Sequence, residues 1–382
     1  MAEIIIFGSG ISSATIARKL AEDGHKITVY EKMDRIGGNC YDYVDAHGVL
    51  VHKYGPHIFH TSNEEVYQFI TRFDKLNGFI NTVKVSVNDL LFPLPINYES
   101  IATISKLDAE HIINVLKEKF VDRATITLYE MKAVEDAKVS KCAEYIWNNV
   151  FANYTSKMWG MPIQQVDSSI INRIKVVLGN GESYFPEDKY QGLPTKGYTN
   201  LIKSMFDHEN IKVVLNSHSK DILSIDGSLQ INGKKFEGNV IYCGLIDELF
   251  DYKFGELEFR SLDIKFESHN VDKFQNVAVI NYPADPKMTR ICEYKNMTFQ
   301  SVHDWTTISK EFPGNYDKNS SSFSTPFYPV TSNKNNLSLY ELYLQETKKY
   351  NNLHLLGRLS QYKYYDMDDA ISAAFELYKK IK

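Results

Sequence analysis

A βαβ unit near the N-terminus restricts the fold of this chain more than any other feature of the sequence. The apolar run Glu3–Phe7 predicts a buried parallel strand, and the apolar spacing over Ile11–Ala21 predicts a helix. A second strand, Lys26–Tyr30, follows and ends at an acidic residue, Glu31. This order of elements is typical of a parallel α/β sheet whose first turn faces a nucleotide cofactor.

The turn between the first strand and the helix has the order Gly8-x-Gly10-x-x-Ser13. Its glycines allow a close approach of the backbone to a pyrophosphate at the positive end of the helix, and Ser13 stands where Gly or Ala is usual. Glu31 lies 31 − 8 = 23 residues after Gly8, near the spacing at which an acid accepts a hydrogen bond from a ribose hydroxyl. The pattern predicts dinucleotide binding; the alternative is a tight βα turn followed by an exposed glutamate.

A glycine pair, Gly37-Gly38, follows this unit within the segment Arg35–Asn39. A glycine pair just beyond the ribose-binding acid is typical of FAD-binding folds, where the backbone passes directly against the cofactor. Folds that bind only a nicotinamide cofactor do not need it. We therefore expect FAD rather than NAD.

The length and charge of the chain narrow the class of protein further. Its 382 residues exceed the roughly 250–300 at which one hydrophobic core stops growing, so we expect more than one domain. A net charge of −5 without a basic block argues against nucleic-acid binding, and no apolar run is long enough to cross a membrane. The cysteines are far apart, which predicts reduced thiols of a cytoplasmic protein: Cys40, Cys142, Cys243 and Cys292.

The expected fold is α/β, with an FAD-binding Rossmann-like domain, an inserted helical domain and an antiparallel β-sheet domain. Apolar runs at 212–215, 228–231 and 239–243 are assigned to the nucleotide-binding sheet. The expected boundaries are 1–80, 192–252 and 338–382 for the FAD-binding domain, 98–170 for the helical domain, and 81–97, 171–191 and 253–337 for the antiparallel sheet domain.

Two local patterns predict single elements. Ser62 with Glu65 three residues later has the sequence of a capping box and predicts the start of a helix. Residues 84–94 alternate between apolar and polar side chains, which predicts a hairpin with its turn at Asn88-Asp89.

The segment His52–Thr61 contains three histidines, including His57 and His60. A metal would need a carboxylate or thiolate partner, and none is close in sequence, so we predict no metal site. Gly55-Pro56 fixes a turn, so the segment is expected to lie as a loop against a ring system.

The same segment resembles the signature of the UDP-galactopyranose mutases, flavoenzymes that interconvert the pyranose and furanose forms of a nucleotide-linked sugar. Further motifs of this family follow in the same order over nearly the whole chain. They are Tyr154-Thr155-x-Lys157-x-Trp159-Gly160, Asn172-Arg173, Tyr184-Phe185, Gly192-Leu193-Pro194-x-x-Gly197-Tyr198, Ile246-Asp247 through Leu262, Thr289-Arg290-Ile291, Tyr328-Pro329, and Gly357-Arg358-Leu359 through Met367.

The resemblance implies a reaction without net redox change. N5 of reduced FAD attacks the anomeric carbon, the nucleoside diphosphate leaves, and the sugar recloses through its other ring hydroxyl before the diphosphate returns. The cofactor supplies the difficult chemistry, and the protein holds the diphosphate and aims the anomeric carbon. UDP-galactopyranose is the expected substrate.

The resemblance also assigns residues. Arg173 and Arg290 are implied as catalytic guanidinium groups on the diphosphate, and His57 lies on the loop beside the flavin N5. The implied substrate contacts are Phe151, Tyr154, Trp159, Arg173, Tyr184, Phe185, Arg290, Tyr328 and Tyr364. The implied FAD contacts are Gly8, Gly10, Ser13, Glu31, Lys32, Gly38, Asn39, His57, Ile58, Arg358, Tyr364, Asp366 and Met367.

Two departures from the family pattern bear on the substrate. Val150 replaces one of two adjacent phenylalanines, and Thr103 stands roughly where a base-contacting glutamine is common. Together they leave room for a thymine methyl, so dTDP-fucopyranose is the first alternative substrate and UDP-N-acetylgalactosamine the second.

Two other classes of function remain open from the sequence: an FAD-dependent amine oxidase or desaturase, and a flavin- or nucleotide-binding protein without catalysis. The resemblance implies as partners a nucleotide-diphosphate sugar, an NAD(P)H or other reductant for the flavin, and a second copy in a homodimer. The expected role is polysaccharide synthesis in the cytoplasm.

Overall fold

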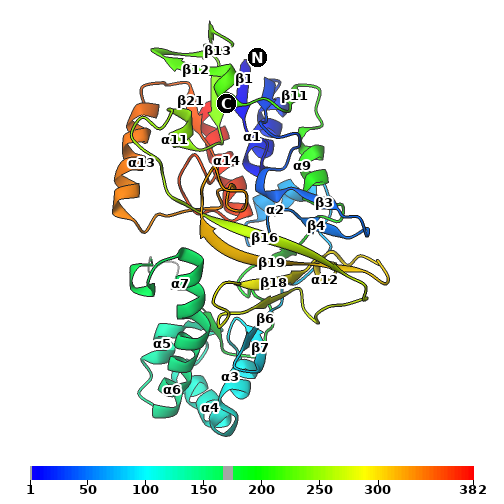
Figure 1. Cartoon of the computed structure of the whole chain (residues 1–382), viewed down its shortest axis with the longest axis vertical. Helices are drawn as coiled ribbons and strands as arrows, with labels where there is room; N and C mark the ends of the chain where they lie inside the picture. Colours follow the sequence, from blue (N-terminus) through cyan, green and yellow to red (C-terminus); the bar gives the residue numbers. More distant parts are fainter. Residues whose placement is uncertain (1, 167–174) are drawn as a thin grey trace.

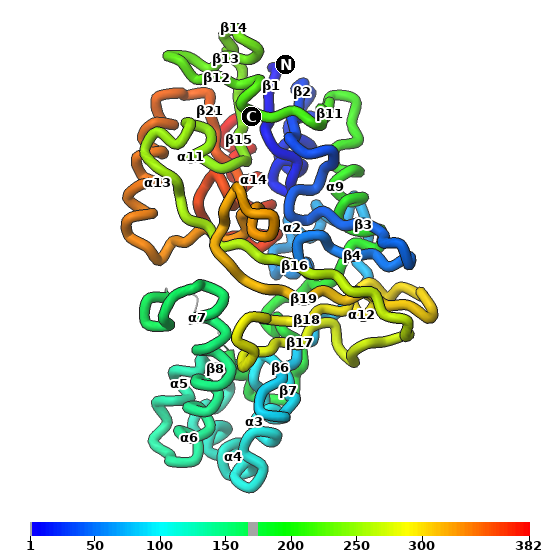
Figure 2. The backbone as a smooth tube through the Cα atoms, in the orientation of Figure 1, coloured from blue at the N-terminus to red at the C-terminus, as the bar shows by residue number. Residues whose placement is uncertain are grey.

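A computed structural model describes residues 2–166 and 175–382. Figure 1 shows three groups of elements along the long axis of the molecule: a parallel sheet with its helices, a long mixed sheet across the middle, and a group of helices. Figure 2 shows the two ends of the chain close together at the end formed by the parallel sheet. In the described part of the chain, no helix combines the length and apolar character needed to cross a bilayer.

The parallel sheet has the strand order β11-β2-β1-β15-β21. Its central strand, β1, is buried on both faces, which explains its unbroken apolar run. The strands are β1 (Glu3–Phe7), β2 (Lys26–Tyr30), β11 (Ile211–Val214), β15 (Asn239–Tyr242) and β21 (Leu353–Leu355), and the helices that join or cover them are α1 (Ile11–Glu22), α2 (Glu64–Thr71), α9 (Tyr198–Phe206), α10 (Ser219–Ile222), α11 (Ile246–Leu249), α13 (Lys334–Thr347) and α14 (Met367–Ile381).

One strand assigned to this sheet from the sequence lies elsewhere. Ser228–Ile231 is β13, the centre of a small antiparallel sheet with β12 (Leu223–Asp226) and β14 (Lys234–Lys235). Tight turns at Gly227 and Gly233 join the three strands, so each strand pairs with its neighbour in sequence. The short-range turns override the apolar pattern that suggested a return to the parallel sheet.

The helix α2 begins one residue later than the predicted capping box would place it. Asn63 is the N-cap, and its side chain accepts hydrogen bonds from the backbone N–H groups of Glu65 and Val66. Ser62 instead donates its hydroxyl hydrogen bond to the carbonyl of Glu187. The capping-box assignment of Ser62 was therefore wrong, because Asn63 satisfies the same orphan donors.

The long sheet has the order β20-β16-β19-β18-β17-β6-β7 and is antiparallel except between β17 and β6. The predicted hairpin forms its edge, with Asn88 and Asp89 both at positive φ in the two-residue turn. Its strands are β6 (Val83–Val87), β7 (Leu90–Leu94), β16 (Phe259–His269), β17 (Val279–Asn281), β18 (Arg290–Glu293), β19 (Thr306–Asn315) and β20 (Tyr328–Pro329), and the short helix α12 (Lys295–Thr298) follows β18.

The group of helices beside this sheet ends in a continuous run, α6 (Ala137–Ile146), a π-helical turn (Trp147–Ala152) and α7 (Asn153–Trp159). Gly160 ends α7 in a left-handed conformation. The other helices of this group are α3 (Tyr98–Ser105), α4 (Ala109–Lys119) and α5 (Leu128–Lys132).

The described residues also form three two-stranded ribbons: β3 (Asp42–Val44) with β4 (Leu50–His52), β5 (Phe59–Thr61) with β10 (Tyr190–Gly192), and β8 (Thr125–Thr127) with β9 (Lys175–Val177). Short 3₁₀ turns lie at Gly38–Cys40, Lys106–Asp108 and Ile163–Gln165.

Candidate active site

The glycine-rich turn lies at the carboxyl edge of the parallel sheet, where α/β folds bind their ligands. Gly10 is the N-cap of α1, and a Cβ atom built on it would meet nothing within 4 Å. Gly38 closes the same cradle: it lies at φ 54°, and its Cβ would stand 3.1 Å from the Cα of Gly10. The helix N-terminus therefore faces open space lined by bare backbone, which fits the pyrophosphate of FAD.

The other predicted cofactor residues around this turn have different tasks. Glu31 is 6% exposed, and one carboxylate oxygen accepts bonds from the backbone N–H (2.9 Å) and hydroxyl (2.6 Å) of Ser9. Ser13, which replaces the usual third glycine, donates its hydroxyl to the carbonyl of Gly8 at 2.6 Å, so it serves the turn itself. Lys32 is exposed, and the Asn39 amide donates to the carbonyl of Pro326 at 3.4 Å.

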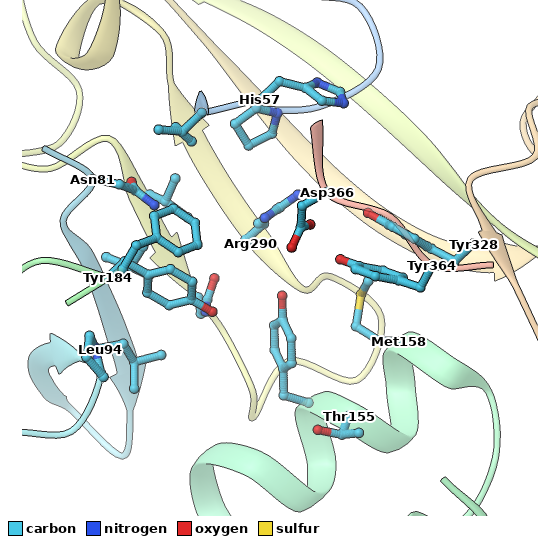
Figure 3. A pocket seen from close by; sticks show the side chains of 18 of the residues that line it. His57, Asn81, Leu94, Thr155, Met158, Tyr184, Arg290, Tyr328, Tyr364 and Asp366 are labelled. Atoms are coloured by element: carbon cyan, nitrogen blue, oxygen red, sulfur yellow. The ribbon is translucent and has the colours of Figure 1, made fainter. Parts of the chain in front are cut away.

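A cavity of about 600 Å³ is lined by residues of the long sheet, of α7, and of the segments that follow β4 and β21. It gathers predicted residues from segments far apart in the sequence. They are His57, Ile58, Phe151, Tyr154, Trp159, Tyr184, Phe185, Arg290, Tyr328, Arg358, Tyr364, Asp366 and Met367. Figure 3 shows Arg290 between Tyr184 on one side and Tyr328 with Tyr364 on the other.

A buried carboxylate, that of Glu311, holds the guanidinium of Arg290 in place. Arg290 begins β18, and its Nε donates to Oε2 of Glu311 on the neighbouring strand β19 at 2.7 Å. The Glu311 side chain is fully buried, whereas that of Arg290 is 24% exposed. Burial alone would lower the pKa of Arg290, but the negative charge of Glu311 raises that pKa well above its ordinary value. Only Nε makes a hydrogen bond to a described residue, so the two terminal nitrogens of the guanidinium can bind a ligand.

Glu311 also reaches the histidine-containing loop. Its Oε1 atom has no hydrogen-bond partner among the described residues, and a Cβ on Gly55 would lie 3.0 Å from it. Gly55 has φ 91°, a conformation that side-chain-bearing residues rarely adopt. The loop before His57 therefore packs on the acid that supports Arg290, and only glycine fits at this contact.

The hydrogen bonds of His57 define its protonation state. Burial lowers its pKa to about 3, so the ring is neutral at pH 7. Its Nδ1 lies 2.8 Å from the carbonyl of Gly55, which can only accept, so Nδ1 carries the proton and Nε2 is an acceptor. The backbone N–H of His57 donates to Nδ1 of His52 at 3.0 Å, and this bond holds the loop 53–57 against His52.

Arg358 supports two of the phenols. It follows β21 at the carboxyl edge of the parallel sheet, and its guanidinium donates to the carbonyls of Phe327 (3.1 Å) and Tyr365 (2.6 Å). The rings of Tyr328 and Tyr364 stack with their centroids 5.7 Å apart, and the Arg358 guanidinium carbon lies 5.5 Å from each. Burial raises the pKa of Tyr328, so this phenol is a neutral donor at pH 7.

Sequence reasoning missed several residues that line the cavity. Asn81 and Asn281 are buried, line it, and have side-chain oxygens without a partner among the described residues. Asn281 stands directly opposite Arg290 in the β17–β18 pair. Arg260, also part of the lining, is 5% exposed. The signal for these residues is burial of polar groups, which a single sequence does not display.

Two residues singled out from the sequence need separate comment. Arg173 lies outside the described residues. Thr103 lies on α3, donates its hydroxyl to the carbonyl of Glu99 at 2.9 Å, and is not part of the cavity lining. Half of the sequence argument for a thymine base is therefore wrong, because the Thr103 hydroxyl bonds the backbone of its own helix and the residue does not line the cavity. Val150, the other half, does line it.

The fold and the site together define a flavoprotein: an FAD-binding α/β architecture with a cavity in which a buried glutamate holds an arginine. The profile of the UDP-galactopyranose mutase family matches residues 149–364, more than half of the chain, and that of an NAD(P)-binding Rossmann-like domain matches residues 6–73.

Individual relatives give the same result. The UDP-galactopyranose mutase of Mycoplasma genitalium is 39% identical over 97% of this chain and 92% of its own length. The dTDP-fucopyranose mutase of Escherichia coli is 33% identical over 98% and 97%. A crystal structure of reduced UDP-galactopyranose mutase covers 100% of this chain and 94% of its own with a TM-score of 0.73 at 13% identity. The chain belongs to the UDP-galactopyranose mutase family and is a nucleotide-sugar mutase.

Proposed function

We propose that this enzyme interconverts UDP-galactopyranose and UDP-galactofuranose with reduced FAD. One observation carries the proposal: Arg290, fixed by the buried Glu311, stands in the middle of the cavity with its terminal nitrogens unused by that pair. Predicted flavin contacts lie at one end and apolar side chains such as Leu94 at the other (Figure 3). A diphosphate at Arg290 directs its sugar to the flavin and its base to the apolar end.

The residues of the chain have separable tasks in this reaction. When bound, reduced FAD supplies a nucleophilic nitrogen, N5, toward the anomeric carbon. Arg290 stabilises the negative charge that grows on the diphosphate as the sugar–oxygen bond breaks, and Tyr184 and Tyr328 donate neutral hydrogen bonds to the same group. We further propose Arg173 as a second guanidinium there. His57 presents an acceptor, Nε2, so it orients a donor and does not release a proton.

One observation favours a second substrate. Val150 lines the apolar end together with Val83, Val85 and Val279, and a phenylalanine there would occupy more space. dTDP-fucopyranose is therefore our alternative substrate, in line with the 33% identity to a dTDP-fucopyranose mutase. The finding that Thr103 does not line the cavity weakens this alternative and leaves UDP-galactose as our first choice.

A product assay separates these possibilities. The purified flavoprotein is reduced with dithionite and given UDP-galactose, dTDP-fucose and UDP-N-acetylgalactosamine in separate reactions, and furanose products are resolved by chromatography. We expect product from UDP-galactose in the reduced enzyme and little in the oxidised enzyme. Equal activity in both states would refute the proposed role of reduced FAD, and oxygen consumption with an amine but no furanose would instead favour an amine oxidase.

The family resemblance also suggests the oligomeric state, the reductant and the cellular role of the enzyme. We propose a homodimer in the cytoplasm that takes electrons from NAD(P)H or another reductant and supplies furanose units for polysaccharide synthesis. The four cysteines are free thiols, and three of them are buried, as suits a reducing compartment. Light scattering should give twice the chain mass, and bleaching of the flavin absorbance by NADH or NADPH would identify the reductant.

A further inference from the structure

Lys157 makes an unusual set of contacts between α7 and the long sheet. Its ammonium donates to three backbone carbonyls, those of Tyr282 (3.0 Å), Asp285 (2.5 Å) and Met288 (2.5 Å). A lysine ammonium has three N–H donors, so these bonds satisfy it fully. All three carbonyls belong to the loop that joins β17 to β18, although Lys157 itself lies on a helix of the inserted helical group.

This loop ends directly at Arg290. The backbone N–H of Tyr282 donates to the carbonyl of Thr289 at 2.8 Å, which closes the loop at its base. Asn281 precedes it, pairs with Arg290 in the strand register, and lines the cavity. A contact that orders the loop therefore orders the two cavity residues at its ends.

The helix that carries Lys157, α7, forms another wall of the cavity. Tyr154 and Trp159 lie on the same helix as Lys157, within three residues of it, and both line the cavity. Arg260 fixes the end of this helix by donating from Nε to the carbonyl of Met158 at 2.7 Å and from Nη2 to that of Lys157 at 3.2 Å. The backbone of α7 is thus held by Arg260, and the Lys157 side chain links this helix to the loop before Arg290.

We propose that Lys157 is a positioning residue that couples two walls of the ligand site: the α7 wall with Tyr154 and Trp159, and the wall at Arg290 that would hold the diphosphate. The inference rests on the proposed function, because it takes the ligand to be a nucleoside diphosphate that touches both walls. A ligand that binds two walls gains from their fixed separation, since the second half binds at a high effective concentration once the first is in place. Without the Lys157 contacts this gain falls, while each half keeps its own contacts.

Binding of UDP and of its two parts tests the coupling. Holoenzyme with Lys157→Met is titrated with UDP, uridine and pyrophosphate. This substitution keeps most of the length of the side chain and removes the ammonium. We expect the Kd for UDP to rise at least tenfold, the Kd values for uridine and pyrophosphate to stay within twofold, and KM to rise more than kcat falls. An unchanged Kd for UDP, or the same loss for all three ligands, would overturn the proposal.

Lys295 provides a matched control. Its ammonium also donates to three backbone carbonyls, those of Asp272 (2.9 Å), Trp305 (2.8 Å) and Val302, but none of these residues lines the cavity. Lys295→Met should lower thermal stability about as much as Lys157→Met and leave the Kd for UDP within twofold. An equal loss of UDP affinity in both variants would show a general loss of structure and would also overturn the proposal.

Hydrogen exchange in the unaltered enzyme provides a test that needs no variant. UDP should slow amide exchange in α7 and in the loop 282–289 together; protection of one segment without the other contradicts the coupling. If neither UDP nor dTDP binds the unaltered enzyme, the proposed function itself fails. Binding without coupling refutes only the role of Lys157.

Discussion

The glycine-rich turn and the cavity around Arg290 are built from different parts of the chain. The turn uses backbone: Gly10 and Gly38 leave space because they lack side chains, and the N–H groups of α1 face that space. The cavity uses side chains, chiefly Arg290 with its buried partner Glu311. A backbone site tolerates no added atoms, whereas a side-chain site tolerates no removed ones, so opposite substitutions should separate cofactor retention from turnover.

The largest expected effect comes from truncating the side-chain site. Arg290→Ala should lower kcat/KM by about 10²–10³-fold, because one preorganised charged donor on the developing negative charge is lost. The flavin-to-protein absorbance ratio should stay the same. Steady-state kinetics and the visible spectrum measure the two quantities.

A matched control for this variant is Arg123→Ala. Arg123 also pairs with a glutamate, Glu130, at 2.6 Å, but on the exposed surface. It should leave kcat/KM unchanged, since exposed ion pairs contribute little. Loss of FAD from Arg290→Ala would contradict the separation of the two sites.

Adding one methyl group to the backbone site should have the next largest effect. Gly10 has φ −75°, which any residue adopts, so Gly10→Ala should fold with an unchanged Tm. Its FAD dissociation constant should rise about tenfold or more, or about 1.4 kcal/mol, because the methyl occupies the approach of the pyrophosphate. Gly38→Ala, at φ 54° and 3.1 Å from Gly10, should lower Tm as well. Full FAD affinity in Gly10→Ala would show that the pyrophosphate lies elsewhere.

The pH dependence of stability tests His52, whose Nδ1 accepts a hydrogen bond from the backbone N–H of His57. Burial lowers its pKa to about 3, and it is 1% exposed. As pH falls below about 6.5, the unfolded chain binds a proton that the folded chain does not, so stability should decrease by at most about 1.4 kcal/mol per pH unit. Urea unfolding between about pH 5 and 7 measures the slope. His52→Asn should reduce this slope; an unchanged slope in the variant would assign it to other groups.

The smallest expected effect concerns the base. Val150→Phe should shift the ratio of Kd values for dTDP and UDP several-fold toward UDP, since a difference of about one methyl in an apolar pocket is worth about 1–3 kcal/mol at most. Thr103→Gln should not change the ratio, because Thr103 does not line the cavity. A larger effect at Thr103 than at Val150 would restore the sequence-based alignment.

The same contrast explains what the sequence could predict. The cofactor turn was predictable because Gly8, Gly10 and Glu31 lie within one βαβ unit, where local spacing determines geometry. The hairpin at Asn88-Asp89 was predictable for the same reason. Glu311 and Asn281 could not be found, because their importance comes from burial next to Arg290, a property of strand pairing rather than of local spacing.

Most of the cavity residues were predicted from the family resemblance and not from local spacing. The prediction was wrong at Thr103, where the alignment to the family was uncertain. The resemblance predicted Arg290, Tyr184 and Tyr328 as ligand contacts, and all three line the same cavity. It placed Thr103 at the base, although that residue faces its own helix. The strand at 228–231 was misassigned because an apolar run does not specify which partner it pairs with.

The packing of α1 against α14 joins two helices that lie far apart in the sequence. Lys19 of α1 lies 4.8 Å from the ring centre of Tyr378, whose hydroxyl donates to Asp23 at 2.7 Å. On the ribosome, α1 emerges early, while α14 and β21 are among the last elements made. The part of α1 that contacts α14 therefore stays uncovered until α14 has been made, whereas its contacts with β1 and β2 can form early.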